Sequence, residues 1–157
     1  MNTGDIGRIS ETAVIQRLLQ KGVEVLLPWS SHLGYDVAYY VVEEYRNFGF
    51  FVHREARLVR IQVKTGRLTK DGSAIVFSTQ QIHPSSRTGY QDSKRDYRRS
   101  DYRGKADYIA VYLPDNGKVY MIAVEECPKN TGIFHFKGHE TGYNKGKRAR
   151  WAEDYEI

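Results

Sequence analysis

The order of the apolar runs limits the fold of this chain more than any other property of its sequence. The stretch from Asp5 to Lys21 has the composition of a helix, which Thr3 or Asp5 can cap and Gly22 can end. Short runs rich in β-branched and aromatic residues follow the helix, and turn residues separate them. The sequence therefore predicts an α/β domain in which one helix precedes a mixed central β-sheet.

The runs after the helix give the predicted strands. These are Val23–Leu27, Tyr35–Val42, Leu58–Thr65, Ala74–Ser78, Tyr108–Leu113 and Lys118–Val124. Asp71-Gly72 indicates a hairpin between the third and fourth strands, and residues 114–117 indicate one between the last two. The Phe-rich insertion at 48–51 has three possible interpretations, namely a hairpin, a contact in an oligomer or part of the core.

The length and the single cysteine indicate one domain in a reducing compartment. A chain of 157 residues fits a single compact domain over residues 1–157. Cys127 is the single cysteine, so no intrachain disulfide can form. The N-terminus has no basic start followed by an apolar run, and no later run approaches the roughly 20 apolar residues of a membrane span. We therefore expect a cytoplasmic protein without a membrane partner.

The positive charge is concentrated in two segments. The net charge is +5, yet residues 84–105 carry seven basic against three acidic residues and residues 136–151 carry five against one. The rest of the chain is therefore net acidic, and this segregation is what a phosphate-binding surface requires. The residues expected to contact nucleic acid are Arg87, Lys94, Arg95, Arg98, Arg99, Arg103, Lys145, Lys147, Arg148 and Arg150.

The first basic segment also contains tyrosines. Tyr90, Tyr97 and Tyr102 alternate with its arginines, and the stretch from 85 to 104 has almost no aliphatic residues. We expect this stretch to lie outside the core and to contact duplex DNA through its phosphates and base edges. A solvated loop, or a surface on which single-stranded RNA bases stack, are the alternatives.

Glu11 is an acidic residue among apolar neighbours on the predicted helix. At helical spacing it shares a face with Val14, Ile15 and Leu18. Burial of an unpaired charge costs several kcal/mol, so the carboxylate needs a metal, a cation or hydrogen-bond donors. A structural salt bridge to Arg8 or Lys64 is the alternative to a functional role.

Two further features lie on predicted strands. Asp36 is unusual near the start of a strand, and Gly34 before it permits a sharp backbone turn. A carboxylate that caps a turn is the alternative. In the run from 60 to 64, strict alternation places Arg60, Gln62 and Lys64 on one strand face, as in any half-exposed antiparallel strand.

Taken together and in this order, these residues resemble the PD-(D/E)XK nuclease superfamily, whose core places a helix before three strands. Gly34-Tyr35-Asp36 matches the family's strand-opening Asp, and Gln62-Val63-Lys64 matches its acid-X-Lys triplet. Glu11 matches the helical Glu of several branches. The Gln-X-Lys variant and the compact sequence at 61–66 look most like the small homing endonucleases of bacterial group I introns. Motifs support the resemblance over about the first 70 residues, and Gln62 departs from the usual acid.

The resemblance implies catalysis by Glu11, Asp36, Gln62 and Lys64, with a Mg²⁺ that Mn²⁺ can replace. Asp36, Gln62, Glu11 and the backbone carbonyl of Val63 are the expected metal ligands, because Mg²⁺ prefers hard oxygen donors. Lys64 can stabilise the phosphate or help to deprotonate the attacking water. Glu11 supplies negative charge that Gln62 lacks.

The sequence thus predicts a site-specific, metal-dependent double-strand DNA endonuclease of the intron-homing kind. Two active sites must address two strands, so we expect a homo-oligomer, either a dimer or a tetramer. A restriction endonuclease and a Holliday-junction resolvase share the same site and remain alternatives. A non-catalytic DNA-binding module with a decayed site is a third, and Gln62 is its best argument.

Overall fold

The computed structural model describes residues 2–30, 33–47, 51–84, 97–139 and 149–157; for 45–47, 51–53, 82–84 and 97–99 it describes the backbone alone. Within these ranges the elements are α1 (Thr3–Gln20), β1 (Val37–Asn47), β2 (Phe51–Thr65), β3 (Arg67–Leu68), β4 (Ala74–Ser78), β5 (Gln81–Pro84), β6 (Tyr97–Ser100), β7 (Tyr108–Leu113), β8 (Lys118–Ala123), η1 (Val124–Glu126), β9 (Thr131–His135) and η2 (Ala152–Asp154). No helix in this described part is long and apolar enough to cross a membrane.

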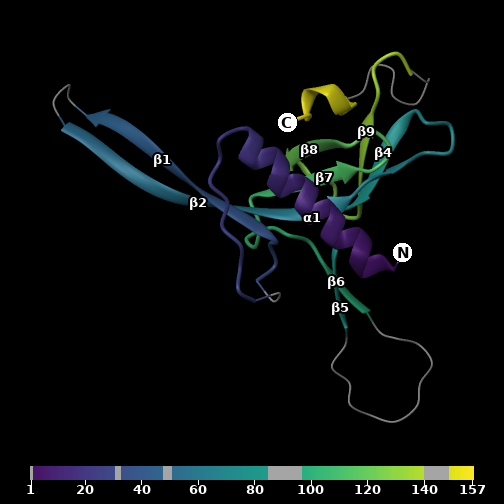
Figure 1. Cartoon of the computed structure of the whole chain (residues 1–157), viewed down its shortest axis with the longest axis horizontal. Helices are drawn as coiled ribbons and strands as arrows, with labels where there is room; N and C mark the ends of the chain where they lie inside the picture. The colour runs from purple at the N-terminus through teal and green to yellow at the C-terminus, as the bar shows by residue number, and fades with distance from the viewer. Residues whose placement is uncertain (1, 31–32, 48–50, 85–96, 140–148) are drawn as a thin grey trace, which may run out of the picture.

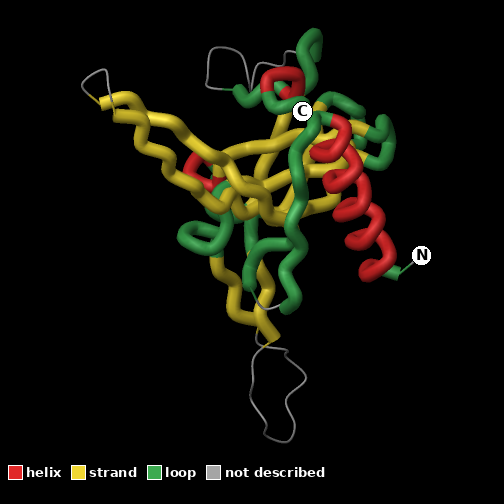
Figure 2. The backbone as a smooth tube through the Cα atoms, turned by 60° about the vertical axis from the view of Figure 1, so that its left-hand side comes forward, coloured by secondary structure: helices red, strands yellow, loops and turns green. Residues whose placement is uncertain are grey.

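The elements form three layers (Figures 1 and 2). The central sheet has the order β1-β2-β7-β8, in which β2 and β7 run parallel and the other neighbours run antiparallel. Helix α1 covers one face, where Val14 and Leu18 pack against Ile61 and Val63 of β2. The sheet β3-β4-β9 covers the other face, where the core includes Phe134. The predicted α/β architecture, a helix followed by a mixed sheet, is confirmed.

Helix α1 begins earlier than the sequence indicated. Its N-cap is Asn2, whose side chain accepts a hydrogen bond from the N–H of Asp5, while the Asp5 carboxylate accepts one from the N–H of Asn2. The prediction that Thr3 or Asp5 caps the helix is therefore wrong, because this reciprocal pair satisfies two backbone N–H groups at once. Gly22, with a φ of 75°, follows the end of the helix as expected.

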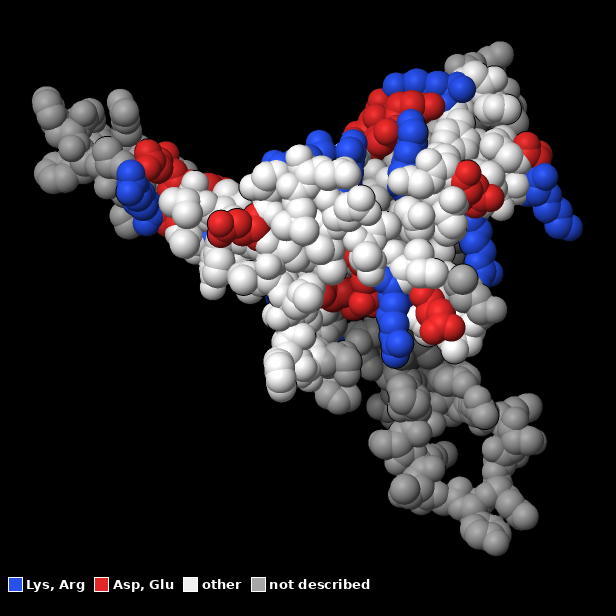
Figure 3. Space-filling model, viewed as in Figure 1, with Lys and Arg blue, Asp and Glu red and all other residues white. Residues whose placement is uncertain are grey.

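Strands β1 and β2 form a long hairpin that projects from the body (Figure 1). Their pairing runs from Val37 opposite Ile61 to Asn47 opposite Phe51, so both strands extend further than predicted. The strands on either side of the Phe-rich insertion thus form a hairpin, as the first interpretation predicts; residues 48–50 themselves lie outside the described part. Acidic and basic side chains lie next to one another near the tip of this hairpin (Figure 3), with ion pairs Arg54–Glu44 at 2.6 Å and Arg57–Glu43 at 3.8 Å.

Two predicted pairings differ from the structure. The run Val23–Leu27 is not a strand, and its pairing is limited to an isolated bridge between Leu26 and Ala38. The turn at Asp71-Gly72 joins β3 to β4, so the strand that ends at Thr65 is not part of that hairpin. Gly66 lies between β2 and β3, and a Cβ at this position would lie 2.8 Å from the side chain of Ile75. The predicted hairpin of β7 and β8 is confirmed.

The first basic segment is not entirely outside the core. Strand β6 lies within this segment and pairs with β5, which ends where the segment begins, and the two-stranded ribbon they form projects from the body (Figure 1). Tyr102, two residues after β6, is only 2% exposed and belongs to the same core cluster as Ile109. The expectation that residues 85–104 contribute nothing to the core is therefore wrong, because an aromatic ring from a polar segment fills the core beside the ribbon.

Candidate active site

Asp36 lies immediately before β1, and its carboxylate contacts β2. The N–H of Asp36 donates to the carbonyl of Ile61 at 2.9 Å, which joins the start of β1 to β2. Its Oδ2 accepts a hydrogen bond from the N–H of Val63 at 2.7 Å and another from the side-chain amide of Gln62. Two donors from one strand therefore fix the orientation of this carboxylate.

Gly34 makes the turn that brings Asp36 to this position. Its φ is +74°, a conformation that side chains other than glycine rarely adopt. A Cβ at this position would lie 3.1 Å from Cδ of Lys105, whose side chain passes over the glycine. The sharp turn predicted before Asp36 is confirmed, and it also allows the close approach of Lys105.

Gln62 occupies the face of β2 opposite to Ile61 and Val63, as the alternation predicts. Its side chain is nearly buried, at 9% exposed. Its amide nitrogen donates both to the Asp36 carboxylate and, at 3.3 Å, to the carbonyl of Val63. Since one nitrogen contacts both oxygens, the carboxylate and the carbonyl face a common point beside the Gln62 amide.

Lys64 lies two residues further along β2 on the same face as Gln62. Its ammonium donates to the hydroxyl of Tyr102 at 2.6 Å and lies 4.8 Å from the centre of the Tyr102 ring. Burial lowers the pKa of Lys64, and the nearby Asp36 carboxylate opposes this shift. Burial likewise raises the pKa of Asp36, against the opposing effects of the Val63 N–H, Lys64 and Gln62.

Glu11 lies on α1 close to the end of β2. The adjacent Ser10 is hydrogen-bonded through its hydroxyl to Thr65 at 2.6 Å, and Thr65 directly follows Lys64. Partial burial, and then repulsion by Asp36, raise the pKa of Glu11, while Arg8 opposes the shift. Among the ion pairs of the described residues, none joins Glu11 to Arg8 or Lys64. The structure therefore places Glu11 near Asp36 without the salt bridge that the alternative interpretation required.

The donor atoms at this site suit a hard divalent cation. Across the residues that the structure describes, no three His, Cys, Asp or Glu side chains cluster as a metal site would require. The candidate ligands are instead Asp36, Glu11, the Val63 carbonyl and the amide oxygen of Gln62. All four supply oxygen, which Mg²⁺ prefers, and the Asp36 carboxylate and the Val63 carbonyl already face one point. The structure directs the amide nitrogen of Gln62 to that point, so its oxygen would ligate the ion after the amide turns by about 180°. The residues present therefore fit such an ion.

The structure describes the side chains of two of the ten expected nucleic-acid contacts. Arg103 forms ion pairs with Asp101 at 2.8 Å and Glu125 at 3.5 Å, and it donates to the Cys127 carbonyl. Arg150 donates to the carbonyl of Glu126 at 2.6 Å. The backbones of Arg98 and Arg99 lie in β6, on the ribbon. The other six, which are Arg87, Lys94, Arg95, Lys145, Lys147 and Arg148, lie outside the described residues.

Sequence reasoning did not find Tyr102 as a residue of this site. It was grouped with the tyrosines of the basic segment, because no apolar periodicity marks its position as buried. One signal was present in the sequence: Lys64 is flanked by core residues and needs a buried partner. The sequence does not show which residue supplies that partner.

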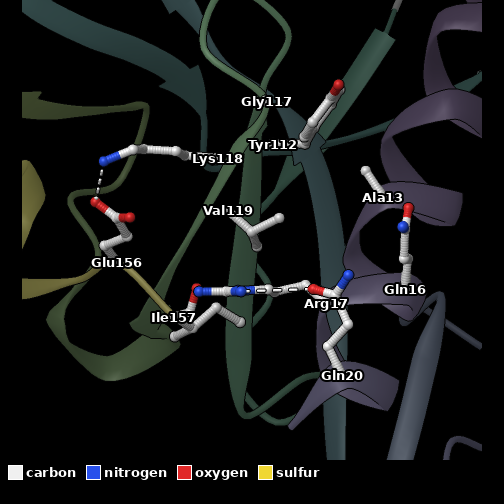
Figure 4. Close-up of a pocket in the computed structure, with 10 residues that line it drawn as sticks. All are labelled: Ala13, Gln16, Arg17, Gln20, Tyr112, Gly117, Lys118, Val119, Glu156 and Ile157. Atoms are coloured by element: carbon white, nitrogen blue, oxygen red, sulfur yellow. Dashed lines mark hydrogen bonds and ion pairs between the residues drawn. The ribbon is translucent and has the colours of Figure 1, made fainter.

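Two cavities in the described part of the chain lie apart from these residues. A cavity of about 340 Å³ lies between α1 and β8 (Figure 4), and none of the four candidate catalytic residues lines it. Within it, the guanidinium of Arg17 donates to the Ile157 carbonyl, and Lys118 forms an ion pair with Glu156 at 2.8 Å. A second cavity, of about 560 Å³ and lined partly by Ile9 and Leu68, also excludes the four.

Comparisons with known proteins agree with this geometry. A model of the PD-(D/E)XK endonuclease family matches residues 1–157. The solved structure of a bacterial homing endonuclease, I-Ssp6803I, is similar with a TM-score of 0.64 and 22% sequence identity, covering 99% of this chain and 89% of that chain. At that identity the likeness shows the fold. A search of the curated proteins gave no significant match.

Proposed function

Because the chain belongs to the PD-(D/E)XK endonuclease family, we propose that it is a site-specific, metal-dependent endonuclease that hydrolyses phosphodiester bonds in both strands of duplex DNA. The observation that carries this proposal is the contact of the Asp36 carboxylate with the N–H of Val63 and the amide of Gln62. It brings together the two halves of the family motif, one from the residue before β1 and the other from β2. Magnesium-dependent cutting of duplex plasmid DNA at one sequence is the direct test.

The side chains of the site have distinct roles in this proposal. Asp36, with the Val63 carbonyl, Gln62 and Glu11, would hold the cation. When bound, the ion would neutralise charge on the phosphate and lower the pKa of a nearby water. Lys64 donates hydrogen bonds to the extra negative charge that develops on the phosphate, or accepts the proton of the attacking water. Glu11 restores the negative charge that Gln62 removes from the usual motif.

The finer role that we propose is intron homing by a homo-oligomer, either a dimer or a tetramer. The Gln-X-Lys motif and the likeness to a bacterial homing endonuclease support the first part. A two-fold axis would supply one active site for each strand, which supports the second. Apolar side chains that are well exposed, including Trp29 at 104%, Tyr40 at 63% and Val42 at 59%, are available for contacts between copies.

Gln62→Glu tests the assignment of Gln62 to the metal site. Without metal, the new carboxylate lies beside that of Asp36, so the variant should unfold at a lower temperature than the wild type. With Mg²⁺ the melting temperature of the variant should recover. A ligand that binds only the folded state and is present at about 100 times its Kd stabilises that state by about 2.7 kcal/mol. Melting curves across a Mg²⁺ titration measure this difference. A variant whose melting temperature responds to Mg²⁺ less than that of the wild type would place Gln62 away from the metal.

Replacement of Arg95, Arg98, Arg99 and Arg103 by Ala tests the basic segment. We expect weaker binding to every duplex and a flatter salt dependence, since each lost phosphate contact removes about 0.9 from the slope of log K against log salt. Arg103→Ala alone should change the slope by less than about 0.9, because Arg103 must first leave its ion pairs with Asp101 and Glu125. Fluorescence anisotropy at several salt concentrations gives the slopes. An unchanged slope for the fourfold variant would mean that the segment does not contact phosphates.

A further inference from the structure

Tyr102 is buried in a way that its surrounding sequence does not explain. It follows the ribbon of β5 and β6 in a segment rich in arginine and serine, yet its side chain is 2% exposed. The ring lies in the core cluster with Ile109 of β7 and Ala106. The hydroxyl, by contrast, reaches the ammonium of Lys64. One side chain therefore joins the core to the candidate active site.

The hydrogen bonds of the Tyr102 hydroxyl fix its direction. The hydroxyl has one proton, and it donates this proton to the carbonyl of Gln80 at 3.3 Å. Its oxygen lone pairs are then left to accept the hydrogen bond from the Lys64 ammonium at 2.6 Å. The same contact leaves the ammonium 4.8 Å from the centre of the ring, at its hydroxyl edge. The tyrosine thus holds Lys64 through its hydroxyl oxygen.

The two residues that form this hydrogen bond, Gln80 and Tyr102, flank the ribbon of β5 and β6. Gln80 directly precedes β5, and Tyr102 follows β6 by two residues. The side chain of Gln80 donates to Asn130 at 2.6 Å, and the Lys105 ammonium donates to Gln81 at 3.0 Å. The base of the ribbon is therefore tied to the body at the place where the hydroxyl of Tyr102 is held.

We propose that Tyr102 is the positioning residue of Lys64: its hydroxyl, oriented by the Gln80 carbonyl, holds the ammonium where the scissile phosphate is bound. This inference rests on the proposed function and deepens it, because it names the group that directs the lysine of the motif. An ammonium on a flexible four-carbon side chain loses much rotational freedom when it is held in this way. The side chain loses this freedom when the protein folds, before DNA binds, so the lysine is preorganised for the reaction.

Tyr102→Phe removes the hydroxyl and keeps the ring in the core. We expect the single-turnover rate of duplex cleavage to fall by about 10- to 100-fold, the size of effect that a misplaced catalytic group produces. Affinity for the duplex should stay at the wild-type value, since the hydroxyl is buried. In a Lys64→Met background, Tyr102→Phe should cause no further loss, because the tyrosine acts through the lysine. Additive losses in the double variant would overturn the proposal.

Tyr120→Phe is the matched control. Tyr120 is 1% exposed, lies in the same core cluster and also carries a hydrogen-bonded hydroxyl, which accepts from Asn116 at 3.0 Å. It does not contact Lys64, so this variant should cut at the wild-type rate although it loses a comparable hydrogen bond. Equal losses of rate in the two Tyr→Phe variants would reduce Tyr102 to a structural residue and contradict the proposal.

A measurement on the protein without DNA separates the positioning role of Tyr102 from the proposed nuclease function. Side-chain NMR of the lysine ammonium groups should show Lys64 as rigid in the wild type and mobile in Tyr102→Phe, while the exposed Lys70 is mobile in both. A wild type that cuts no duplex but holds Lys64 rigidly would contradict the nuclease activity and support the positioning role. A wild type in which Lys64 moves as freely as Lys70 would overturn the positioning role, whatever the variant does.

Discussion

Asp36→Asn is expected to lower the rate of Mg²⁺-dependent duplex cleavage by at least about 1000-fold. The Asn side chain can still accept the hydrogen bonds from the Val63 N–H and the Gln62 amide, so the local structure should persist. What it removes is the negative charge of the carboxylate in the first half of the motif, which contacts the second half. Loss of that charge weakens the hold on a cation and so removes the neutralisation of the phosphate.

Binding to the duplex should survive this change. Deletion of an anion beside the scissile phosphate relieves repulsion when no metal is present, so the affinity should be equal or tighter. The fold should survive as well. Burial raises the pKa of Asp36, so the ionised form destabilises the folded protein at neutral pH, and the neutral Asn avoids this cost.

Cleavage rate, duplex affinity and melting temperature should be measured on one preparation. Asp115→Asn, at an exposed position in the turn between β7 and β8, is the control and should change none of the three. If Asp36→Asn cuts at the wild-type rate, then Asp36 is a residue of the turn and the proposed site is wrong.

Lys64→Met should reduce cleavage by about 100- to 1000-fold, the loss that follows removal of one preorganised donor from a transition state. The same substitution should not lower the stability of the folded protein. Burial lowers the pKa of Lys64, so the charged form costs stability in full at every pH below its folded pKa, and this cost falls as the pH rises from that value to the ordinary lysine pKa of 10.5. Methionine fills a similar volume without a charge. We therefore expect a melting temperature equal to or above that of the wild type.

Opposite effects on rate and stability distinguish a catalytic lysine from a structural one. Lys70→Met removes a lysine from the exposed turn between β3 and β4 and should leave the rate unchanged. A Lys64→Met protein that is clearly less stable and still cuts normally would make Lys64 a structural residue, held by Tyr102 for the sake of the core.

The parts of the site that the sequence could predict are those set by local periodicity. Alternation along β2 placed Gln62 and Lys64 on one face, and the order of helix and strands placed Asp36 next to the start of β1, which begins one residue later at Val37. Helical spacing likewise placed Glu11 beside the apolar residues that face the sheet. In each case a short-range pattern was enough to place the residue, because the neighbouring elements always bury the apolar face of the helix or strand.

The parts that the sequence could not predict depend on contacts between distant segments. Tyr102 is buried because the ring fills space next to β7, which its polar neighbours do not reveal. The run at Val23–Leu27 has the composition of a strand, but it pairs with β1 through a single isolated bridge. Strand β2 extends back to Phe51 because β1 pairs with it along its whole length. Pairing partners and packing decided these cases, and local propensity did not.

The most direct test of the proposed activity is to incubate a library of duplex plasmids with the protein, with and without Mg²⁺, and to sequence the ends produced. The proposal predicts breaks in both strands clustered at one sequence, produced only with a divalent metal and absent with Asp36→Asn. Mn²⁺ should substitute for Mg²⁺. A wild-type protein that binds a duplex tightly yet produces no ends with either metal would contradict the proposal and identify the chain as a non-catalytic DNA-binding member of its family.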